Sequence, residues 1–356
     1  MKTIYYPKNS KGNPYVSTVY NAIEDAGYEV YDLPDLKKGY KFAKSIEIIN
    51  LNWFDSIAGC GMIKAIALLF RQMLRIIYYK LMGMKIIYTL HNRQAHDTKF
   101  PRINKCLMRF LSKKADKIVV LCNYSKRILS DFLTDEEIEE KVTVIYLPNY
   151  IDVYPNVKNE INELPQSDDR FKILFFGYIR PYKNIEIILE VAEQLKEKKI
   201  DIVLAGRPYN DVYKEEILSF CKDELNIFPC LRFIKDEEVT TFFDWADVVV
   251  LPLSLKSSLN SSSAILAFSM KCTVISPLVG TLMDIPNQED LFTYKYKDES
   301  FHSQALLEEI NHAYNVWQKD SKKIKEMGEN LYNYVKNNNS YEQTLKRYKE
   351  LYDELV

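Results

Sequence analysis

Short apolar runs alternate with helical segments along most of the chain, and this alternation limits the possible folds more than any other feature. In the first half, the runs that predict strands are residues 2–7, 28–33, 46–54, 85–90, 117–122 and 142–147. Segments with helical spacing separate them, among them 62–82 and 101–114. Strands that alternate with helices favour a parallel sheet covered on both faces.

A polar segment divides this pattern into two halves. Residues 147–170 contain three prolines and many Asn, Asp and Glu residues, which is typical of a linker. The alternation then restarts, with strands predicted at 171–177, 201–206, 230–234, 246–253, 273–276 and 291–296. A chain of 356 residues suits two domains of about 170 residues each. The sequence therefore predicts an α/β protein with two doubly wound, Rossmann-like domains, which bind a ligand in a cleft at the carboxyl ends of their strands.

Composition excludes several classes of protein. Apolar residues make up 47% of the chain and charged residues 27%, as in a soluble globular protein. A net charge of −1 argues against nucleic-acid binding. The six cysteines are scattered without metal-like spacing, which predicts reduced thiols in a cytoplasmic protein. The first residues, MKTIYYP, enter a strand directly, so we expect no signal peptide.

A loop of small polar residues in the second half has the features of an anion site. Asn260, Ser261, Ser262 and Ser263 follow the apolar strand 246–253 and open an apolar helix. The unpaired N–H groups and the dipole of a helix start favour a phosphate, and small side chains let it approach. The alternative is that Asn260 or Ser261 is only an N-cap residue.

Two further strand ends in the second half carry a glycine and a cation. Gly177 follows one predicted strand, and Arg180 and Lys183 stand just before the next helix, where they could neutralise a phosphate. Gly206 and Arg207 follow the next strand. Each turn alone could be an ordinary solvated loop. Together with the serine loop they indicate a diphosphate site, and we see no paired carboxylates that would require a metal.

In the first half, His91 ends the strand at 85–90, and His96 and Asp97 follow within six residues. A histidine at the carboxyl end of a strand is a candidate for hydrogen bonding or acid–base chemistry. The alternative is a structural histidine. If a catalytic base is needed, Asp97 is one candidate, and Asp55, at the end of the strand predicted at 46–54, is another.

The segment from Gly59 to Lys114 is strongly basic, with twelve Lys or Arg residues and one acid. Lys64, Arg71 and Arg75 share one helical face, and large apolar residues surround them. The segment is either a core helix with a solvated stripe or a surface that docks on anionic lipid headgroups, with its apolar side partly in the interface. A true span would bury these charges at a cost of about 2.5 kcal/mol or more each, which excludes it.

Several of these stretches resemble GT-B glycosyltransferases, most of all the family 4-like group (glycosyltransferase group 1) of bacterial polysaccharide biosynthesis. ILFFGYIRPYKN (173–184) is similar to the phosphate turn of that group, with Lys183 on its lysine. The other matching stretches in the second half are DIVLAGRP (201–208), LRFIKDEEVTTFFDWADVVVLPL (231–253) and SSSAILAFSMKCTVISPLVG (261–280). In the first half they are IIYTLHN (86–92), ADKIVVLCNYSKRIL (115–129) and VIYLPNYID (144–152).

This resemblance implies a metal-independent hexosyltransferase of the GT-B fold, with two Rossmann-like domains facing across a cleft. Residues 1–155 plus 340–356 would bind the acceptor, and residues 165–338 would bind a nucleotide-diphosphate sugar, UDP- or GDP-linked. The implied donor-binding residues are Gly177, Arg180, Lys183, Gly206, Arg207, Ile234, Asn260, Ser261, Ser262 and Ser263. The implied acceptor loop is Gly12, Asn13, Pro14 and Tyr15, and His91 and Asp97 are the catalytic candidates.

The expected acceptor is a saccharide, lipid-linked through a polyprenyl carrier, at the inner face of the cell membrane. Lys64, Arg71 and Arg75 would hold the protein there peripherally. The chain departs from the family at two places, because Ser258 and Leu266 stand where retaining members carry glutamates. Tyr178 also replaces the usual arginine of the phosphate turn, with Arg180 two residues on. Stereochemistry, base and ribose contact therefore stay open, as do two rival functions, a nucleotide-sugar epimerase and a non-catalytic partner subunit.

Overall fold

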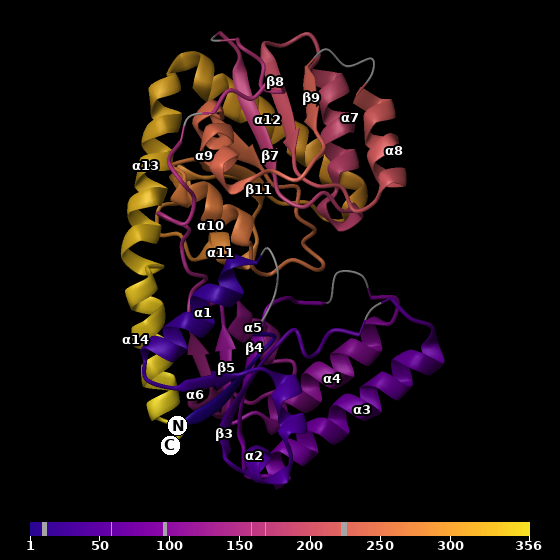
Figure 1. Cartoon of the computed structure of the whole chain (residues 1–356). Coiled ribbons are helices and arrows are strands. Elements are labelled where there is room, and N and C mark those ends of the chain that lie inside the picture. Colours follow the sequence, from indigo (N-terminus) through magenta and orange to yellow (C-terminus); the bar gives the residue numbers. More distant parts are fainter. Residues whose placement is uncertain (9–12, 58, 95–97, 158, 168, 222–225) are drawn as a thin grey trace. The chain divides into compact units, whose positions relative to one another are not determined.

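A computed structural model describes the whole chain except residues 9–12, 58, 95–97, 158, 168 and 222–225. The chain forms two compact units (Figure 1). Unit 1 contains Met1–Pro148, Lys256–Asn260 and Asn338–Val356, and unit 2 contains Asn149–Leu255 and Ser261–Asn337. Residues 149–155 thus belong to unit 2, and the short segment 256–260 belongs to unit 1, which the sequence pattern did not indicate.

Unit 1 is built on a six-stranded sheet in which each neighbouring pair is parallel. Its order is β2-β1-β3-β4-β5-β6. The strands are β1 (Lys2–Tyr6), β2 (Glu29–Tyr31), β3 (Ile46–Asn52), β4 (Lys85–Leu90), β5 (Lys117–Val120) and β6 (Val142–Val144). The central strands are buried apolar runs, as a parallel sheet covered on both faces requires.

Helices cover both faces of this sheet. Ile4 of β1 points into a core formed with α3 and α4. Thr3 points the other way, and its hydroxyl reaches the phenol oxygen of Tyr352 on α14, which packs beside α1. The helices of unit 1 are α1 (Pro14–Asp25), α2 (Tyr40–Lys44), α3 (Met62–Leu81), α4 (Pro101–Lys114), α5 (Ser125–Leu129), α6 (Asp135–Lys141) and α14 (Tyr341–Asp353), with a 3-10 turn at Leu33–Lys38.

Unit 2 repeats the same architecture with another strand order, β12-β11-β10-β7-β8-β9. Read in chain order this is the 3-2-1-4-5-6 arrangement of a dinucleotide-binding fold. The strands are β7 (Phe171–Phe176), β8 (Ile200–Ala205), β9 (Ile227–Cys230), β10 (Val248–Val250), β11 (Thr273–Pro277) and β12 (Phe292–Tyr294). All neighbouring pairs are parallel.

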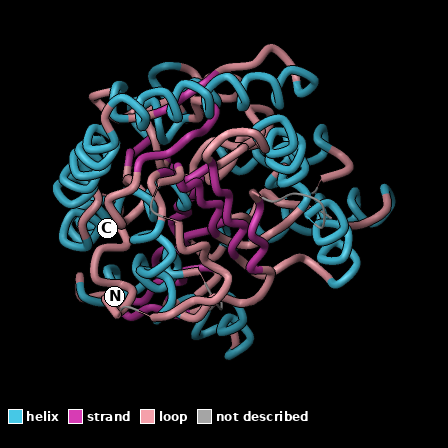
Figure 2. The backbone as a smooth tube through the Cα atoms, turned by 90° about the horizontal axis from the view of Figure 1, so that it is seen from above, coloured by secondary structure: helices cyan, strands magenta, loops and turns pink. Residues whose placement is uncertain are grey.

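Alternate residues of β7 face opposite helix layers. Phe171, Ile173 and Phe175 join the core under α7, α8 and α12, whereas Phe176 contacts Phe242 of α9. Figure 2 shows strands inside and helices outside. The helices of unit 2 are α7 (Ile185–Leu195), α8 (Asp211–Cys221), α9 (Asp236–Trp245), α10 (Ser262–Ser269), α11 (Gly280–Met283), α12 (His302–Lys319) and α13 (Ser321–Asn338), with 3-10 turns at Pro181–Lys183, Gln288–Asp290 and Glu299–Phe301.

One strand and three short helices, α2, α6 and α11, differ from the sequence prediction. The strand predicted at 230–234 lies earlier, at Ile227–Cys230, because an edge strand tolerates the proline at position 229. Helix α6 was not predicted. It begins with a capping box in which the side chain of Thr134 accepts from the Glu137 N–H and the Glu137 side chain accepts from the Thr134 N–H.

Candidate functional site

The strand order of unit 2 points to one edge of its sheet. The order reverses between β7 and β10, and ligands of such sheets bind outside the carboxyl ends of the strands at that switch point. The segments that leave these two strands are joined there, because the side-chain amide of Asn184 donates to the carbonyl of Pro252 at 2.7 Å. Every donor residue predicted between 177 and 184 lies on the first of these segments.

Gly177 and Gly206 let two backbones approach closely. Both have positive φ, +132° and +150°, and a Cβ on Gly206 would lie 1.8 Å from the carbonyl oxygen of Gly177. The pairing of β7 and β8 continues past this point, since the N–H of Ile179 donates to the carbonyl of Arg207 at 3.0 Å. The structure therefore brings Gly177, Gly206 and Arg207 together, as the sequence predicted, and only glycine fits at position 206.

Lys183 ends the 3-10 turn before α7 and is half-buried. Its ammonium lies 5.7 Å from the ring centre of Tyr182, and no described carboxylate pairs with it. Burial lowers the pKa of Lys183 to about 8. A desolvated ammonium without a counter-ion is suited to bind an anionic ligand, because the negative charge of the ligand compensates for the lost hydration of the ammonium.

Arg180 is oriented by two tyrosines. Its guanidinium lies over the ring of Tyr178 at 4.7 Å and over that of Tyr209 at 5.4 Å. This places a second cation three residues from Lys183 on the same loop. The side chain of Arg207 is exposed, and Ile234 is buried just before α9.

The serine loop serves as a helix cap and still leaves donors free. The hydroxyl of Ser261 accepts from the N–H of Ala264 at 3.1 Å, so Ser261 is the N-cap residue of α10. Its own N–H donates to the hydroxyl of Thr281 at 3.1 Å. Within the described part of the chain, the N–H groups of Ser262 and Ser263 meet no acceptor. These two groups, at the positive end of the helix dipole, can bind an anion.

Asn260, the residue before this cap, belongs to unit 1. Its side-chain amide donates to the carbonyl oxygen of His91 at 2.7 Å. The preceding residue, Leu259, is fully buried in the core of unit 1. Asn260 was predicted to bind the donor, and in the structure its side chain holds the backbone at the end of β4.

His91 follows β4, which pairs with β3, next to the switch point of unit 1 between β1 and β3. Its Nε2 lies 2.9 Å from the amide oxygen of Asn52, at the end of β3. The Asn52 nitrogen donates to the carbonyl of Tyr6, so its oxygen must accept, and His91 carries its proton on Nε2. Burial lowers the pKa of His91 to about 3, which keeps the ring neutral. Neutral His91 can accept a hydrogen bond at Nδ1, but it is a weak base.

Two aromatic residues enclose the His91 ring. Trp53 stacks on it with ring centres 4.0 Å apart and an interplanar angle of 18°. Tyr15 meets it edge-on at 5.3 Å. Trp53 has a φ of 50°, a left-handed conformation that a bulky residue rarely adopts. Sequence reasoning missed Asn52 and Trp53, although a polar and an aromatic residue directly after a buried strand could have identified them.

The predicted acceptor loop is partly described. Asn13 is the N-cap residue of α1, Pro14 is its first residue, and Tyr15 contacts His91. Gly12 lies outside the described residues, and so do His96 and Asp97. Tyr15 of the predicted acceptor loop therefore contacts His91, the predicted catalytic residue.

Asp55 is the described carboxylate that follows β3. It is half-buried, and desolvation raises its pKa to about 6, although the Tyr88 hydroxyl opposes this shift. Neither position where the family carries a glutamate has a carboxylate, since residue 258 is a serine and residue 266 a leucine. Ser258 is buried and Leu266 is partly exposed. Among the residues that the structure describes, no three His, Cys, Asp or Glu side chains are grouped to hold a metal ion.

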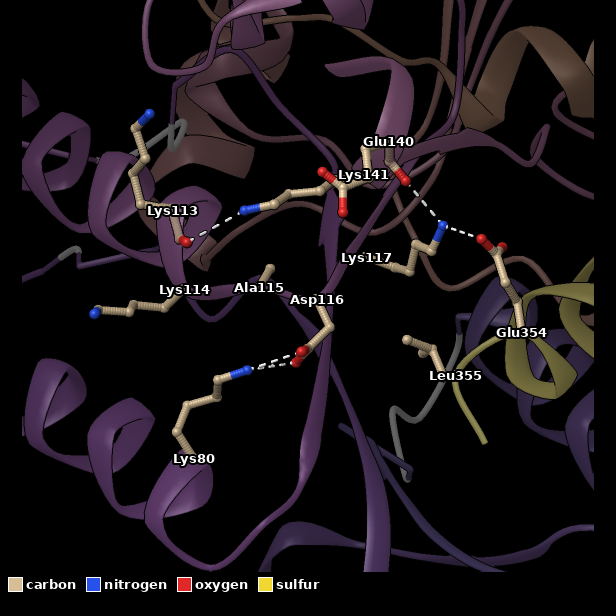
Figure 3. A pocket seen from close by; sticks show the side chains of 10 residues that line it. All are labelled: Lys80, Lys113, Lys114, Ala115, Asp116, Lys117, Glu140, Lys141, Glu354 and Leu355. Carbon is tan, nitrogen blue, oxygen red and sulfur yellow. Dashed lines mark hydrogen bonds and ion pairs between the residues drawn. The ribbon is translucent and has the colours of Figure 1, made fainter. Parts of the chain in front are cut away.

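A cavity of about 430 Å³ lies at the opposite, amino-terminal edge of the unit 1 strands (Figure 3). Lys80 pairs with Asp116 at 2.7 Å, and Lys117 pairs with Glu354. Lys80 and Lys114 also lie in the last turns of α3 and α4, where cations stabilise the negative ends of the helices. These contacts account for the lysines structurally, so this cavity is not the candidate site.

The three cations predicted to face a membrane, Lys64, Arg71 and Arg75, are all exposed on α3. Arg75 donates to the side chain of Gln72 at 3.1 Å. None of the three pairs with a described carboxylate.

Comparisons with known proteins agree with the geometry of unit 2. The model of a family described as "Glycosyl transferases group 1" matches residues 156–334, half of the chain. A "GDP-mannose:glycolipid 4-beta-D-mannosyltransferase" of Xanthomonas campestris pv. campestris is 23% identical over 278 residues, 76% of this chain and 71% of that protein.

Among solved structures, HepE of Anabaena in complex with UDP and glucose matches with a TM-score of 0.70 at 14% identity, over 99% of this chain and 100% of that one. Sucrose-phosphate synthase of Thermosynechococcus elongatus matches with a TM-score of 0.73 at 14% identity, over 99% and 98% of the two chains. The two sheets are thus those of the GT-B fold.

Proposed function

Because this chain belongs to the group 1 glycosyl transferases, we propose that it moves a sugar from a UDP- or GDP-sugar to a lipid-linked saccharide in polysaccharide biosynthesis. It is a glycosyltransferase of the GT-B fold that uses a nucleotide sugar. The proposal concerns the finer points: the donor site, the acceptor and the place where the enzyme works.

The donor diphosphate binds at the switch point of unit 2. One observation carries this assignment: half-buried Lys183 and the N–H groups of Ser262 and Ser263, which have no carboxylate or acceptor partner among the described residues, follow the two strands of the switch point. Arg180 adds a second cation. As the glycosidic bond breaks, negative charge builds on the diphosphate, and these fixed donors stabilise it without a metal. Gly177, Gly206, Arg207 and Ile234 form the surroundings of this site.

The acceptor binds to unit 1, near His91 and the loop of Gly12, Asn13, Pro14 and Tyr15. Neutral His91 accepts a hydrogen bond from a sugar hydroxyl at Nδ1, and the partly exposed Trp53 offers a ring surface on which a sugar packs. Buried Tyr15 supports the His91 ring from the side. If transfer proceeds with inversion, a carboxylate near the acceptor must act as the base. Asp55 fits through its raised pKa, and Asp97 remains the second candidate.

The names of similar proteins support the two substrates. The Xanthomonas protein is named for GDP-mannose and a glycolipid, and the Anabaena structure contains UDP and glucose. A glycolipid acceptor is presented at a membrane surface. Lys64, Arg71 and Arg75 attract the protein to anionic headgroups there, so that it works as a peripheral protein on the cytoplasmic face of the membrane.

A transfer assay tests this function. The full chain is incubated with labelled GDP-mannose or UDP-glucose, with or without polyprenyl-diphosphate-linked saccharides in vesicles. The expected result is label in the lipid phase only when the acceptor is present. An epimerase would convert the donor without any acceptor, and a non-catalytic partner subunit would bind nucleotide without transfer.

A further inference from the structure

Six large apolar side chains form one exposed stripe along α3. Ile63 is 87% exposed, Leu74 65% and Leu81 78%, although the same helix buries Ala65, Ile76 and Tyr79 in the core. The spacing of three or four residues keeps the stripe on one side over about 27 Å of helix. Its members are Ile63, Ile66, Phe70, Leu74, Ile77 and Leu81. Contiguous exposed apolar surface of this kind marks an interaction site.

Cations border this stripe on α3. Lys64, Arg71 and Arg75 each follow a stripe residue directly, so they stand beside it. No exposed acid lies among the described residues of the segment that contains α3 and α4.

A second row of cations lies on α4, which runs beside α3 (Figure 1). This row contains Arg102, Lys105, Arg109 and Lys113, all exposed. Lys105 and Lys113 pair with Asp131 and Glu137, whereas Arg102 and Arg109 pair with no described acid.

We propose that the α3–α4 face, defined as the stripe and these two rows of cations, inserts into the surface of an anionic lipid bilayer. The apolar stripe enters the interfacial layer, and the two rows of cations bind headgroup phosphates. This deepens the membrane association put forward above and rests on it. The new elements are the exposed apolar stripe of α3, which carries the insertion, and the second row of cations on α4.

Helix α3 lies in the plane of the membrane surface. Its stripe covers one side only, and cations at 64, 71 and 75 recur along its length. Among the helices that the structure describes, none combines the length and apolar character needed to cross a bilayer.

A second copy of the chain fits this face less well. A symmetric dimer with antiparallel α3 helices would place stripe on stripe and bring the row of Lys64, Arg71 and Arg75 against the same row of the other copy. Like charges that meet across an interface cost several kcal/mol. An anionic bilayer offers acyl chains to the apolar stripe and headgroup phosphates to the cations of the α3–α4 face.

Flotation with vesicles tests the inference. The full chain is mixed with vesicles of phosphatidylglycerol and phosphatidylcholine in equal parts, at low salt and at about 0.5 M salt, where exposed charges are screened. We expect the wild type to float with the vesicles at low salt and partly at high salt. Phe70→Ser with Leu74→Ser should abolish binding at high salt. Lys64→Gln, Arg71→Gln and Arg75→Gln should each weaken binding roughly fivefold at low salt.

Val212→Ser with Phe220→Ser is the matched control, because it removes two exposed apolar side chains from α8 of unit 2. This variant should float as the wild type does. If the stripe variant also floats unchanged, or the wild type does not float, the inference is wrong. A wild-type dimer that the stripe variant turns into a monomer would likewise overturn it in favour of a second copy. Calorimetry of each variant with GDP and UDP distinguishes a failure of membrane insertion from a failure of the proposed donor site, because the stripe variant should still bind nucleotide if only insertion is lost.

Discussion

The indole of Trp53 stacks on the imidazole of His91, with ring centres 4.0 Å apart. The stack, together with Asn52 and Tyr15, holds the ring in one orientation and with one tautomer at the switch point of unit 1. Trp53 keeps this position at a φ of 50°, a conformation that costs of order 1–3 kcal/mol. The surroundings therefore maintain a strained backbone next to His91.

His91→Phe should lower sugar transfer roughly tenfold, the effect of about one lost hydrogen bond. The shape of the pH–rate profile should not change, because the pKa of His91 is about 3 and the ring is neutral throughout the working range. His312→Phe, at an exposed histidine, is the control. A limb of the profile near pH 6.5 that disappears in His91→Phe would contradict a pure hydrogen-bonding role.

Trp53→Gly should release the His91 ring to water. The pKa of His91 should then rise from about 3 toward the ordinary value near 6.5, which NMR titration of the imidazole carbon protons measures. Trp53→Phe retains a ring over the imidazole and should leave the pKa low. A His91 that titrates identically in both variants would mean that the stack does not desolvate it.

Much of this architecture could be predicted from the sequence, because parallel strands and their helices are local apolar patterns. The glycines at 177 and 206 could be predicted for the same reason, since each follows a strand directly. The interaction between Asn260 and His91 could not, because it joins residues 169 positions apart through the segment 256–260. The desolvation of Lys183 could not be predicted either, because the burial of a charged side chain depends on tertiary packing that the sequence does not show.

Asp55→Asn should raise the free energy of unfolding at pH 7.5 by up to about 3 kcal/mol, the value of a shift of about two pKa units. The folded protein raises the pKa of Asp55 to about 6, above the unfolded value near 3.9. Between about pH 4 and pH 6 the folded protein therefore binds more protons than the unfolded chain, so its stability falls as the pH rises. The stabilisation of the folded protein by protonated Asp55 is fully present below about pH 4 and is lost as the pH rises through 6. Thermal melting should show a gain at pH 7.5 and none at pH 4.

The same variant tests the catalytic base. The wild-type kcat/KM should fall below about pH 6, where Asp55 becomes protonated, and Asp55→Asn should abolish transfer. Asp131→Asn changes an exposed carboxylate and serves as the control. Full activity of Asp55→Asn would leave Asp97 as the candidate base.

Lys183 should make nucleotide binding depend on pH. Its pKa of about 8 means that the free protein loses the charge between pH 7 and 9, so the affinity for a nucleoside diphosphate should fall roughly tenfold over that range. Calorimetry at pH 8 in buffers of different ionisation enthalpy should detect proton uptake on binding. Lys183→Arg keeps its charge and should remove both effects; their persistence would exclude Lys183 as their source.

The backbone of α10 offers the most direct test of the donor site. Ser262 is the first residue of the helix, where proline fits, and Ser261 before it is extended, at φ −132° and ψ 100°, as a residue before proline must be. Ser262→Pro therefore removes one N–H of the proposed phosphate site and keeps the helix. Ser262→Ala removes the hydroxyl and keeps the N–H.

The decisive measurement is the calorimetric affinity of wild type, Ser262→Ala and Ser262→Pro for whichever of GDP and UDP the wild type binds more tightly. The lost N–H should weaken binding about tenfold or more in Ser262→Pro, because a hydrogen bond to a charged group contributes about 1.5–3 kcal/mol. Ser262→Ala should bind as the wild type does. Equal affinities in all three proteins, or a wild type that binds neither nucleotide, would contradict a donor diphosphate site at the start of α10.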